Sequence, residues 1–274
     1  MIIPKEDEEE LLEVLEEALK RVGQGETVAL VTIIEAQGST PQEAGAKMLV
    51  GKEGLIAGTI GGGVTEAKVI EEAKLALKEG KGRLLEYHLT KEQATLGEGA
   101  ICGGEMRVFI DILLPPEEVV IFGAGHISIY VSKLAKMVGF KVRVIDDRKE
   151  FAHPDRFPEA DEVIVEETEK ALSHLKITPS TYIIIVTRGH LKDEEVLASV
   201  VKSPAAYLGM IGSRNKNAVV FKHLEEQGLA AEELKRVHAP IGIDIGAQTP
   251  AEIAVSIIAE IIAVKRGKRG MLND

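Results

Sequence analysis

Residues 119–146 read VVIFGAGHISIYVSKLAKMVGFKVRVID, a stretch in which an apolar run, a glycine turn, a helical pattern and a second apolar run follow one another. The runs 119–122 and 141–146 predict buried β-strands, and 129–138 predicts the helix between them. The segment 123–128 is expected to be a turn. Two near-continuous apolar strands joined by a helix are typical of a parallel sheet, so the stretch indicates a βαβ unit.

The same alternation continues toward the C-terminus. Further strands are expected at 162–165, 181–187 and 206–211. Strands that alternate with helices of about ten or more residues predict an α/β fold with a doubly wound, Rossmann-like parallel sheet. Because Pro115 and Pro116 interrupt the chain just before this part, we assign it to a C-terminal domain of residues 115–274.

The N-terminal part has shorter strands and fewer helices. Strands are expected at 27–34, 47–50, 55–58, 83–88 and 105–113, and helices at about 7–22 and 65–78. Gly51-Lys52-Glu53-Gly54 lies between the second and third of these strands, and this short glycine-bounded connection predicts a hairpin. Residues 1–114 are therefore predicted to form a smaller α+β domain.

The composition narrows the class of partner. The 274 residues include 44 acidic and 33 basic side chains, a formal net charge of −11, which disfavours a nucleic-acid partner. Aromatic residues make up 4% of the chain and tryptophan is absent, which disfavours base stacking as well. One cysteine excludes an internal disulfide and a zinc site built from several cysteines. The N-terminus is acidic and no apolar run approaches the roughly 20 residues of a membrane span, so we expect a soluble cytoplasmic protein.

The turn after the first strand of the C-terminal domain carries the pattern Gly123-x-Gly125-x-x-Ser128. In nucleotide-binding sheets the first glycine permits a tight turn, and the second lets the backbone approach a pyrophosphate at the helix N-terminus. Asp146 follows Gly125 by 21 residues, at the position where an acid binds an adenosine ribose and favours NAD over NADP. Ser128 occupies the third position of the pattern, where glycine or alanine is usual. The pattern fits either a bound nucleotide or phosphate-bearing ligand, or an inherited fold whose phosphate loop is idle.

Further polar residues follow strands of the same predicted sheet. They are His126, Arg188, His190 and Arg214. Open α/β sheets bind ligands at the carboxyl ends of their strands, and arginine suits bidentate contact with anions. The alternative is that each arginine is a surface salt-bridge partner and that His126 makes a local hydrogen bond. The loop 238–250 is expected either to cover this crevice or to be a rigid connector.

Two glycine-rich segments lie in the N-terminal domain. Gly61-Gly62-Gly63 precedes a helix that contains Glu66, and such a triplet either admits an anion close to the backbone or packs tightly at a bend. The other segment is Cys102-Gly103-Gly104. A thiol on a glycine loop suits metal ligation or sulfur transfer, whereas a lone cysteine is more often inert.

These motifs, taken together and in this order, resemble the xanthine dehydrogenase accessory factor family of XdhC/CoxI-type proteins. The resemblance extends from about Val28 to the final helix. The segments that carry it are Gly45-Ala46-Lys47-Met48, Gly58–Glu66, Cys102-Gly103-Gly104, Phe122-Gly123-Ala124-Gly125-His126, Asp146-Asp147-Arg148, Thr187-Arg188-Gly189-His190, Gly209-Met210-Ile211-Gly212-Ser213-Arg214 and Pro240–Glu252. Several motifs in register are far more specific than any one of them.

The resemblance implies an accessory protein rather than a stand-alone enzyme. Such proteins are understood to bind the molybdenum–pterin cofactor, to assist its sulfuration together with a cysteine desulfurase, and to hand it to a xanthine dehydrogenase-like molybdenum hydroxylase. Cys102 would then ligate molybdenum or carry sulfur, because molybdenum accepts a soft thiolate. Relatives often carry a cysteine just after the glycine triplet, where this chain has Val64 and Thr65. This chain would therefore rely on Cys102 alone or work differently.

We expect the candidate residues to line one cleft between the two domains. The expected lining is Gly61–Gly63, Glu66, Cys102, His126, Arg188, His190 and Arg214. Glycine loops would hold the phosphate or dinucleotide tail of the pterin cofactor, and the arginines would neutralise anionic groups. An NAD-dependent oxidoreductase and a regulatory dinucleotide sensor are the alternatives. The amphipathic terminal helices could pair subunits, and a homodimer is the expected assembly because two-fold dimers are the commonest oligomers.

Overall fold

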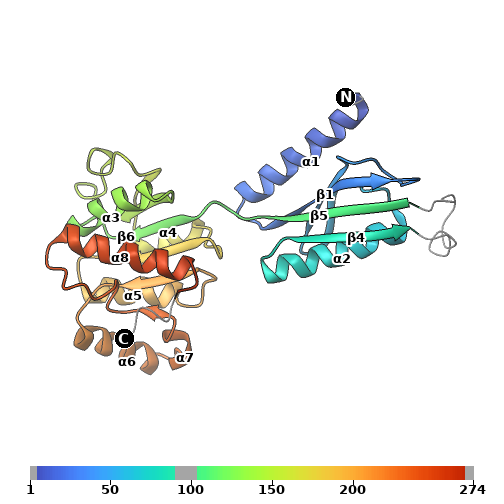
Figure 1. Cartoon of the computed structure of the whole chain (residues 1–274). Helices are drawn as coiled ribbons and strands as arrows, with labels where there is room; N and C mark the ends of the chain where they lie inside the picture. The colour runs from blue at the N-terminus through green and yellow to red at the C-terminus, as the bar shows by residue number, and fades with distance from the viewer. Residues whose placement is uncertain (1–4, 90–103, 269–274) are drawn as a thin grey trace. The chain divides into compact units, whose positions relative to one another are not determined.

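The computed structural model of the chain describes residues 5–89 and 104–268. Cys102 and Gly103, which the sequence singles out, lie outside the described residues. The chain forms two compact units, Met1–Pro115 and Pro116–Asp274 (Figure 1).

The N-terminal unit is a five-stranded antiparallel sheet with strand order β3-β2-β1-β5-β4. Its strands are β1 (Val28–Gln37), β2 (Lys47–Gly51), β3 (Gly54–Gly58), β4 (Arg83–Leu89) and β5 (Gly104–Leu113), and its helices are α1 (Lys5–Gly23) and α2 (Gly63–Glu79). Alternate residues of a strand point to opposite faces of a sheet. Val31 and Met48 therefore pack with α2, whereas Val28 and Leu49 pack with Val14 of α1.

The C-terminal unit is built on a six-stranded parallel sheet with strand order β11-β10-β9-β6-β7-β8. Its strands are β6 (Glu118–Phe122), β7 (Lys141–Asp146), β8 (Glu162–Val165), β9 (Thr181–Ile185), β10 (Tyr207–Met210) and β11 (Val237–His238). Its helices are α3 (His126–Met137), α4 (Thr168–His174), α5 (His190–Val200), α6 (Arg214–Glu226), α7 (Ala231–Leu234) and α8 (Pro250–Lys265), with a short 3₁₀ helix at Pro154–Arg156. The winding reverses between β6 and β9, the switch point at which doubly wound sheets bind ligands.

Helices cover both faces of this parallel sheet. Val131 of α3 and Ile257 of α8 belong to the core on one face, and Val196 of α5 and Val220 of α6 belong to the core on the other. All four side chains are almost fully buried. The predicted α/β fold, with a Rossmann-like doubly wound sheet and a smaller N-terminal α+β unit, is confirmed.

The local predictions differ from the structure mainly at turns. β7 and β8 have the predicted bounds, and the pairing of Gly51 with Gly54 confirms the hairpin. The turn predicted over 123–128 is too long, because α3 begins at His126 with Gly125 as its N-cap. The two-residue strand β11 went unpredicted, since two residues are too few to show a period.

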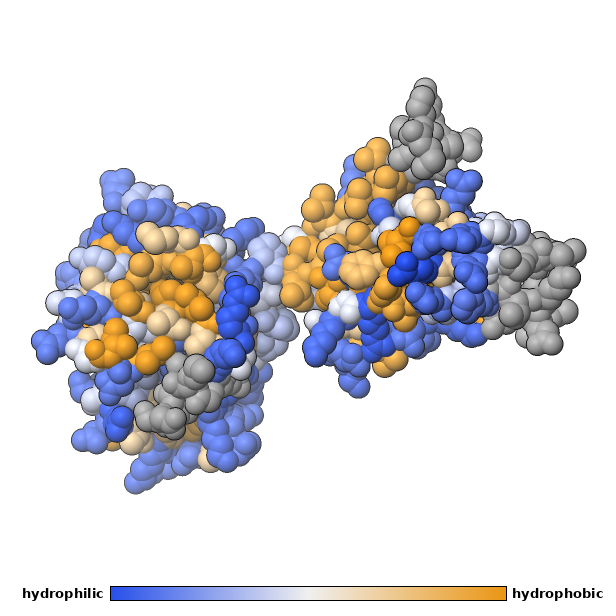
Figure 2. Space-filling view, viewed as in Figure 1, coloured by the Kyte–Doolittle hydropathy of each residue, from blue (hydrophilic) through white to orange (hydrophobic). Residues whose placement is uncertain are grey.

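Apolar side chains also reach the surface of each unit (Figure 2). Leu12 and Leu19 are exposed on α1, and Val255 and Ile262 are exposed on α8. Such faces suit association with another surface, but the homodimer stays a prediction. Within the described residues, no helix is both long enough and apolar enough to cross a membrane.

Candidate functional site

The turn between β6 and α3 is the first part of the candidate site. Gly123 has φ +107°, and a Cβ atom there would lie 2.3 Å from the carbonyl oxygen of Val186, so the fold itself requires glycine. Gly125 differs, since its φ of −74° suits any residue and a Cβ atom there would meet nothing within 4 Å. The lack of a side chain at Gly125 therefore leaves open space in front of the N-terminus of α3.

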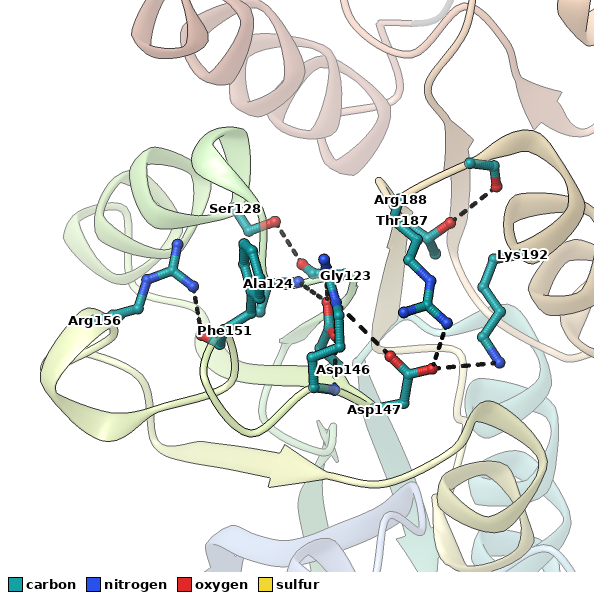
Figure 3. Close-up of polar contacts among 12 residues, drawn as sticks. Gly123, Ala124, Ser128, Asp146, Asp147, Phe151, Arg156, Thr187, Arg188 and Lys192 are labelled. Atoms are coloured by element: carbon teal, nitrogen blue, oxygen red, sulfur yellow. Dashed lines mark hydrogen bonds and ion pairs between the residues drawn. The ribbon is translucent and has the colours of Figure 1, made fainter.

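The serine at the third motif position replaces a packing contact with a hydrogen bond. Ser128 is fully buried, and its Oγ donates to the carbonyl oxygen of Gly123 at 2.5 Å (Figure 3). The bond ties the first turn of α3 to the end of β6. Ser128, which stands where the motif usually has glycine or alanine, thus stabilises the turn through a hydrogen bond.

Asp146 holds the glycine turn in place. Its Oδ2 accepts from the backbone N–H of Ala124 and from Nη2 of Arg148, both at 2.8 Å. Its Oδ1 accepts from the backbone N–H and from Nε of Arg148, at 3.0 and 2.8 Å. Burial acts to raise the pKa of Asp146, but the hydrogen bonds from Arg148 and Ala124 outweigh it and lower the pKa to about 2.

These contacts bear on the ribose-binding role predicted for Asp146. A carboxylate offers about four lone-pair positions, and four donors occupy them here. Asp146 therefore has no acceptor position left for a ribose hydroxyl in this conformation. The NAD site stays a prediction, and the four contacts of Asp146 count against a ribose-binding role for this residue.

The second part of the site follows β9, the neighbour of β6 in the sheet. Gly189 is the N-cap of α5, its φ of 177° is extended backbone, and a Cβ atom there would meet nothing within 4 Å. Asp193, in the first turn of α5, does not cap the helix. Its Oδ1 accepts from the backbone N–H and from Oγ1 of Thr187, at 3.0 and 2.7 Å. Helices α3 and α5 thus both begin at this edge with a glycine N-cap and no side-chain cap.

Asp147 gathers cations at the switch point, which the sequence reasoning missed. Its Oδ2 lies 3.1 Å from Nη2 of Arg188 and 3.8 Å from Nζ of Lys192 (Figure 3). Lys192 also pairs with Glu167 at 2.7 Å, whereas Asp147 is the only ion-pair partner of Arg188 among the described residues. The Arg188 side chain is 53% exposed, so it can leave Asp147 for an arriving anion.

The switch-point crevice is a small pocket at the carboxyl edge of the sheet. It has a volume of about 20 Å³, room for about one water molecule, and is lined by Gly123, Asp147, Thr187, Arg188 and Lys192 among others. Arg188 and its partner Asp147 thus both lie in the wall of this crevice.

The structure separates some residues that the sequence groups together. His126 and His190 are the exposed first residues of α3 and α5, at the carboxyl edge of the sheet. Arg214 is the first residue of α6 and lines a different pocket, beside β10 and β11. Arg188 and Arg214 therefore do not line one pocket.

In the N-terminal unit, Glu66 organises the glycine triplet. One of its oxygens, Oε2, accepts from Oγ1 of Thr59 at 2.5 Å and from the backbone N–H groups of Ile60 and Gly62 at 3.0 and 3.1 Å. Gly61, Gly62 and Gly63 all have positive φ. The contacts of Glu66 are those of a residue that fixes the turn.

Lys47, also in the N-terminal unit, is a residue to which the sequence analysis assigned no role. Its Nζ donates to Oγ1 of Thr32 at 3.2 Å, and burial lowers its pKa. No carboxylate pairs with it among the described residues. The available signal was its place in the Gly45-Ala46-Lys47 segment.

Of the predicted segment Cys102-Gly103-Gly104, only Gly104 lies among the described residues. Gly104 begins β5, where a Cβ atom would lie 2.4 Å from the carbonyl oxygen of Ser39, so close packing accounts for this glycine. Among the described residues, no group of three or more His, Cys, Asp or Glu side chains is placed to hold a metal ion. The roles predicted for Cys102 and Gly103, and the cleft shared by both units, stay predictions.

Comparison with known families covers both units. A family model described as the XdhC Rossmann domain matches residues 119–261, and one described as the XdhC and CoxI family matches residues 22–88. The chain belongs to the XdhC and CoxI family. The resemblance inferred from the motifs is thereby confirmed, and the switch-point residues described above lie inside the XdhC Rossmann domain.

Several relatives of this XdhC and CoxI family chain are known by name. It is 38% identical over 262 residues to YqeB of Escherichia coli K12, covering 95% of the chain but 48% of YqeB, so it spans about half the length of that relative. It is 24% identical to a probable xanthine dehydrogenase subunit of Bacillus subtilis 168, over 88% of the chain and 94% of the relative. It is 22% identical to the molybdenum cofactor insertion chaperone PaoD of Escherichia coli K12, over 92% and 88%.

A solved structure shares the fold. It is described as a xanthine dehydrogenase from Bacillus halodurans and has 23% sequence identity and a TM-score of 0.51, with 93% of this chain and 96% of the other covered.

Proposed function

We propose that the chain is an accessory protein that binds the molybdenum–pterin cofactor as its cargo and supplies it to a xanthine dehydrogenase-like molybdenum hydroxylase. Membership of the XdhC and CoxI family supports the proposal. Two relatives add to it by their names, one as a cofactor insertion chaperone and one as part of a probable xanthine dehydrogenase.

The observation that carries the proposal is the pair of uncapped helix N-termini at the switch point. A helix N-terminus presents unpaired N–H groups and partial positive charge, which favours phosphate. Gly125 and Gly189 are required neither by their backbone angles nor by packing, and the space that they leave open suits a group that approaches the backbone closely. The phosphate-bearing tail of the pterin cofactor has the matching charge.

Arg188 supplies the means of admitting this anion. In the structure it pairs with Asp147 at the mouth of the crevice. An arriving phosphate would take Arg188 from Asp147, and Lys192 would keep Asp147 neutralised. Binding then exchanges one charge pair for another, so the cofactor can be held and still released to the hydroxylase.

Sulfuration is the finer part of the proposal. Cys102 would ligate molybdenum or carry sulfur received from a cysteine desulfurase, since Val64 and Thr65 follow the glycine triplet where relatives often have cysteine. Cys102→Ala should abolish activation of the hydroxylase and leave the circular dichroism spectrum unchanged. Full activation by the variant would overturn this role.

The experiment for cofactor binding uses the full chain and cofactor released from a purified molybdenum hydroxylase. We expect molybdenum and pterin fluorescence to co-elute with the chain in gel filtration. Arg188→Ala should weaken retention about tenfold through loss of one charged contact. The control is Lys222→Ala, an exposed change on α6, which should bind normally. Absence of co-elution for the unmodified chain would overturn the proposal.

A dinucleotide sensor or NAD-dependent oxidoreductase is the second candidate, favoured by the strand order and the glycine turn. The filled acceptor positions of Asp146 count against it. Mass spectrometry of ligands released from the purified chain separates the two. NAD without pterin would favour the second candidate, and pterin without NAD the first.

A further inference from the structure

A second, larger pocket lies beside β10, β11 and α8 and has no part in the proposal above. Its volume is about 710 Å³, within the range of small-molecule sites. It shares no lining residue with the switch-point crevice. Its lining includes Ile211, Arg214, His238, Ile241, Ile245 and Glu260.

A buried polar network forms one wall of this pocket. Glu260 of α8 is 6% exposed, and its Oε2 accepts from the hydroxyl of Tyr207 and from the backbone N–H of Gly242, the latter at 2.9 Å. Its Oε1 lies 3.1 Å from Nδ1 of His238. Burial acts to raise the pKa of Glu260, but the bonds from His238, Tyr207 and Gly242 lower it, so the carboxylate is ionised at neutral pH.

The network fixes the imidazole of His238. Its ring packs on that of Tyr207 at a centroid distance of 4.6 Å, and Nδ1 donates to Glu260. Nε2 is then the ring nitrogen with no partner among the described residues, and 21% of the side chain is exposed. In proteins, a carboxylate that accepts from one ring nitrogen fixes the orientation of the imidazole and leaves the other ring nitrogen for a ligand.

Arg214 carries a positive charge that no other described residue neutralises by an ion pair. It begins α6, lines the same pocket as His238, and has no hydrogen-bond or ion-pair partner in the part of the chain that the structure describes. Ile211, Ile241 and Ile245 give the pocket apolar walls. A cation and a directed nitrogen beside apolar walls match a molecule with an anionic group and an apolar body.

We propose that this pocket is a second ligand site, which takes a small organic anion whose charged group lies on Arg214 and whose body carries a hydroxyl or N–H group that donates a hydrogen bond to Nε2 of His238. The apolar body of the ligand packs against the isoleucines. Phosphate, sulfonate and carboxylate share the required chemistry. Glu260 and Tyr207 are positioning residues, because they act through the imidazole.

The test uses the purified full chain and the probe 1-anilinonaphthalene-8-sulfonate, which combines a sulfonate, an aromatic body and an anilino N–H that can donate to Nε2 of His238. We expect saturable fluorescence at one site per chain, weakened about tenfold in Arg214→Ala by loss of one charged contact. Lys222→Ala lies on the same helix, is exposed and should bind the probe as the unmodified chain does. Equal binding by the unmodified chain and Arg214→Ala would overturn the proposal.

A second readout reports on His238 directly. The ¹⁵N resonance of its Nε2, assigned by its loss in His238→Asn, should shift when the probe is added, and Arg214→Ala should need about tenfold more probe for the same shift. A purely structural network predicts no shift. An unmoved resonance at saturating probe would overturn the proposal, and neither measurement depends on molybdenum.

Discussion

The two glycines of the turn between β6 and α3 should respond to substitution in opposite ways. At Gly125, φ −74° and ψ −168° are angles of an N-cap serine, and nothing lies within 4 Å of the added Cβ. Gly125→Ser should therefore raise the free energy of unfolding by about 0.5–1 kcal/mol, from lost freedom of the unfolded chain and a better cap. The new side chain also fills the space in front of α3, so retention of the molybdenum cofactor should fall at least about tenfold.

Gly123→Ala is the contrasting variant. Its Cβ would lie 2.3 Å from the carbonyl oxygen of Val186 at φ +107°, so strain and displacement should cost more than about 2 kcal/mol. Urea unfolding followed by circular dichroism measures both free energies, and gel filtration with molybdenum analysis measures retention. The reasoning fails if Gly125→Ser is destabilised by more than about 1 kcal/mol, or if it is stable and retains cofactor as before.

Three further changes test the same site. The pKa of Asp146, lowered from 3.8 to about 2, implies a contribution of about 2–3 kcal/mol at neutral pH; Asp146→Asn should lose it. Because the pKa is lowered on folding, the unmodified chain should lose this stability as pH falls through about 4 toward 2, and the variant should not; parallel pH profiles would contradict this. Ser128→Ala should cost about 1–2 kcal/mol in urea unfolding by removing the bond to Gly123, and no change would contradict its role. Arg188→Ala should leave stability within about 0.5 kcal/mol of the original, since its pair with Asp147 is half exposed, and a larger loss would make Arg188 structural.

Local patterns account for the part of the fold that the sequence predicts. The apolar runs, the glycine turn and the proline pair are each read over a few residues, and they place β6, α3, β7 and β8 nearly as observed. The start of α3 was placed too late, because the cap at Gly125 depends on backbone angles rather than on residue type.

The contacts that define the site could not be predicted from such local patterns. Asp146 meets Ala124 across 22 positions and Arg188 meets Asp147 across 41, so only folding brings them together. Spacing singled out Asp146 as a ribose-binding acid, but neither its bond to Ala124 nor its engagement by Arg148 could be read from spacing. The sequence carries one signal of the pair of Glu260 and His238, which is the position of Glu260 within the apolar second half of its helix.

The most direct test of the proposed function is activation of an apoenzyme. A xanthine dehydrogenase-like hydroxylase lacking its cofactor is mixed with a limiting amount of free molybdenum–pterin cofactor, with and without the full chain, and hydroxylase activity is measured over time. The proposed role predicts that the chain raises the activated fraction several-fold, and that Gly125→Ser removes most of this gain. The same activated fraction at every concentration of the chain would contradict it.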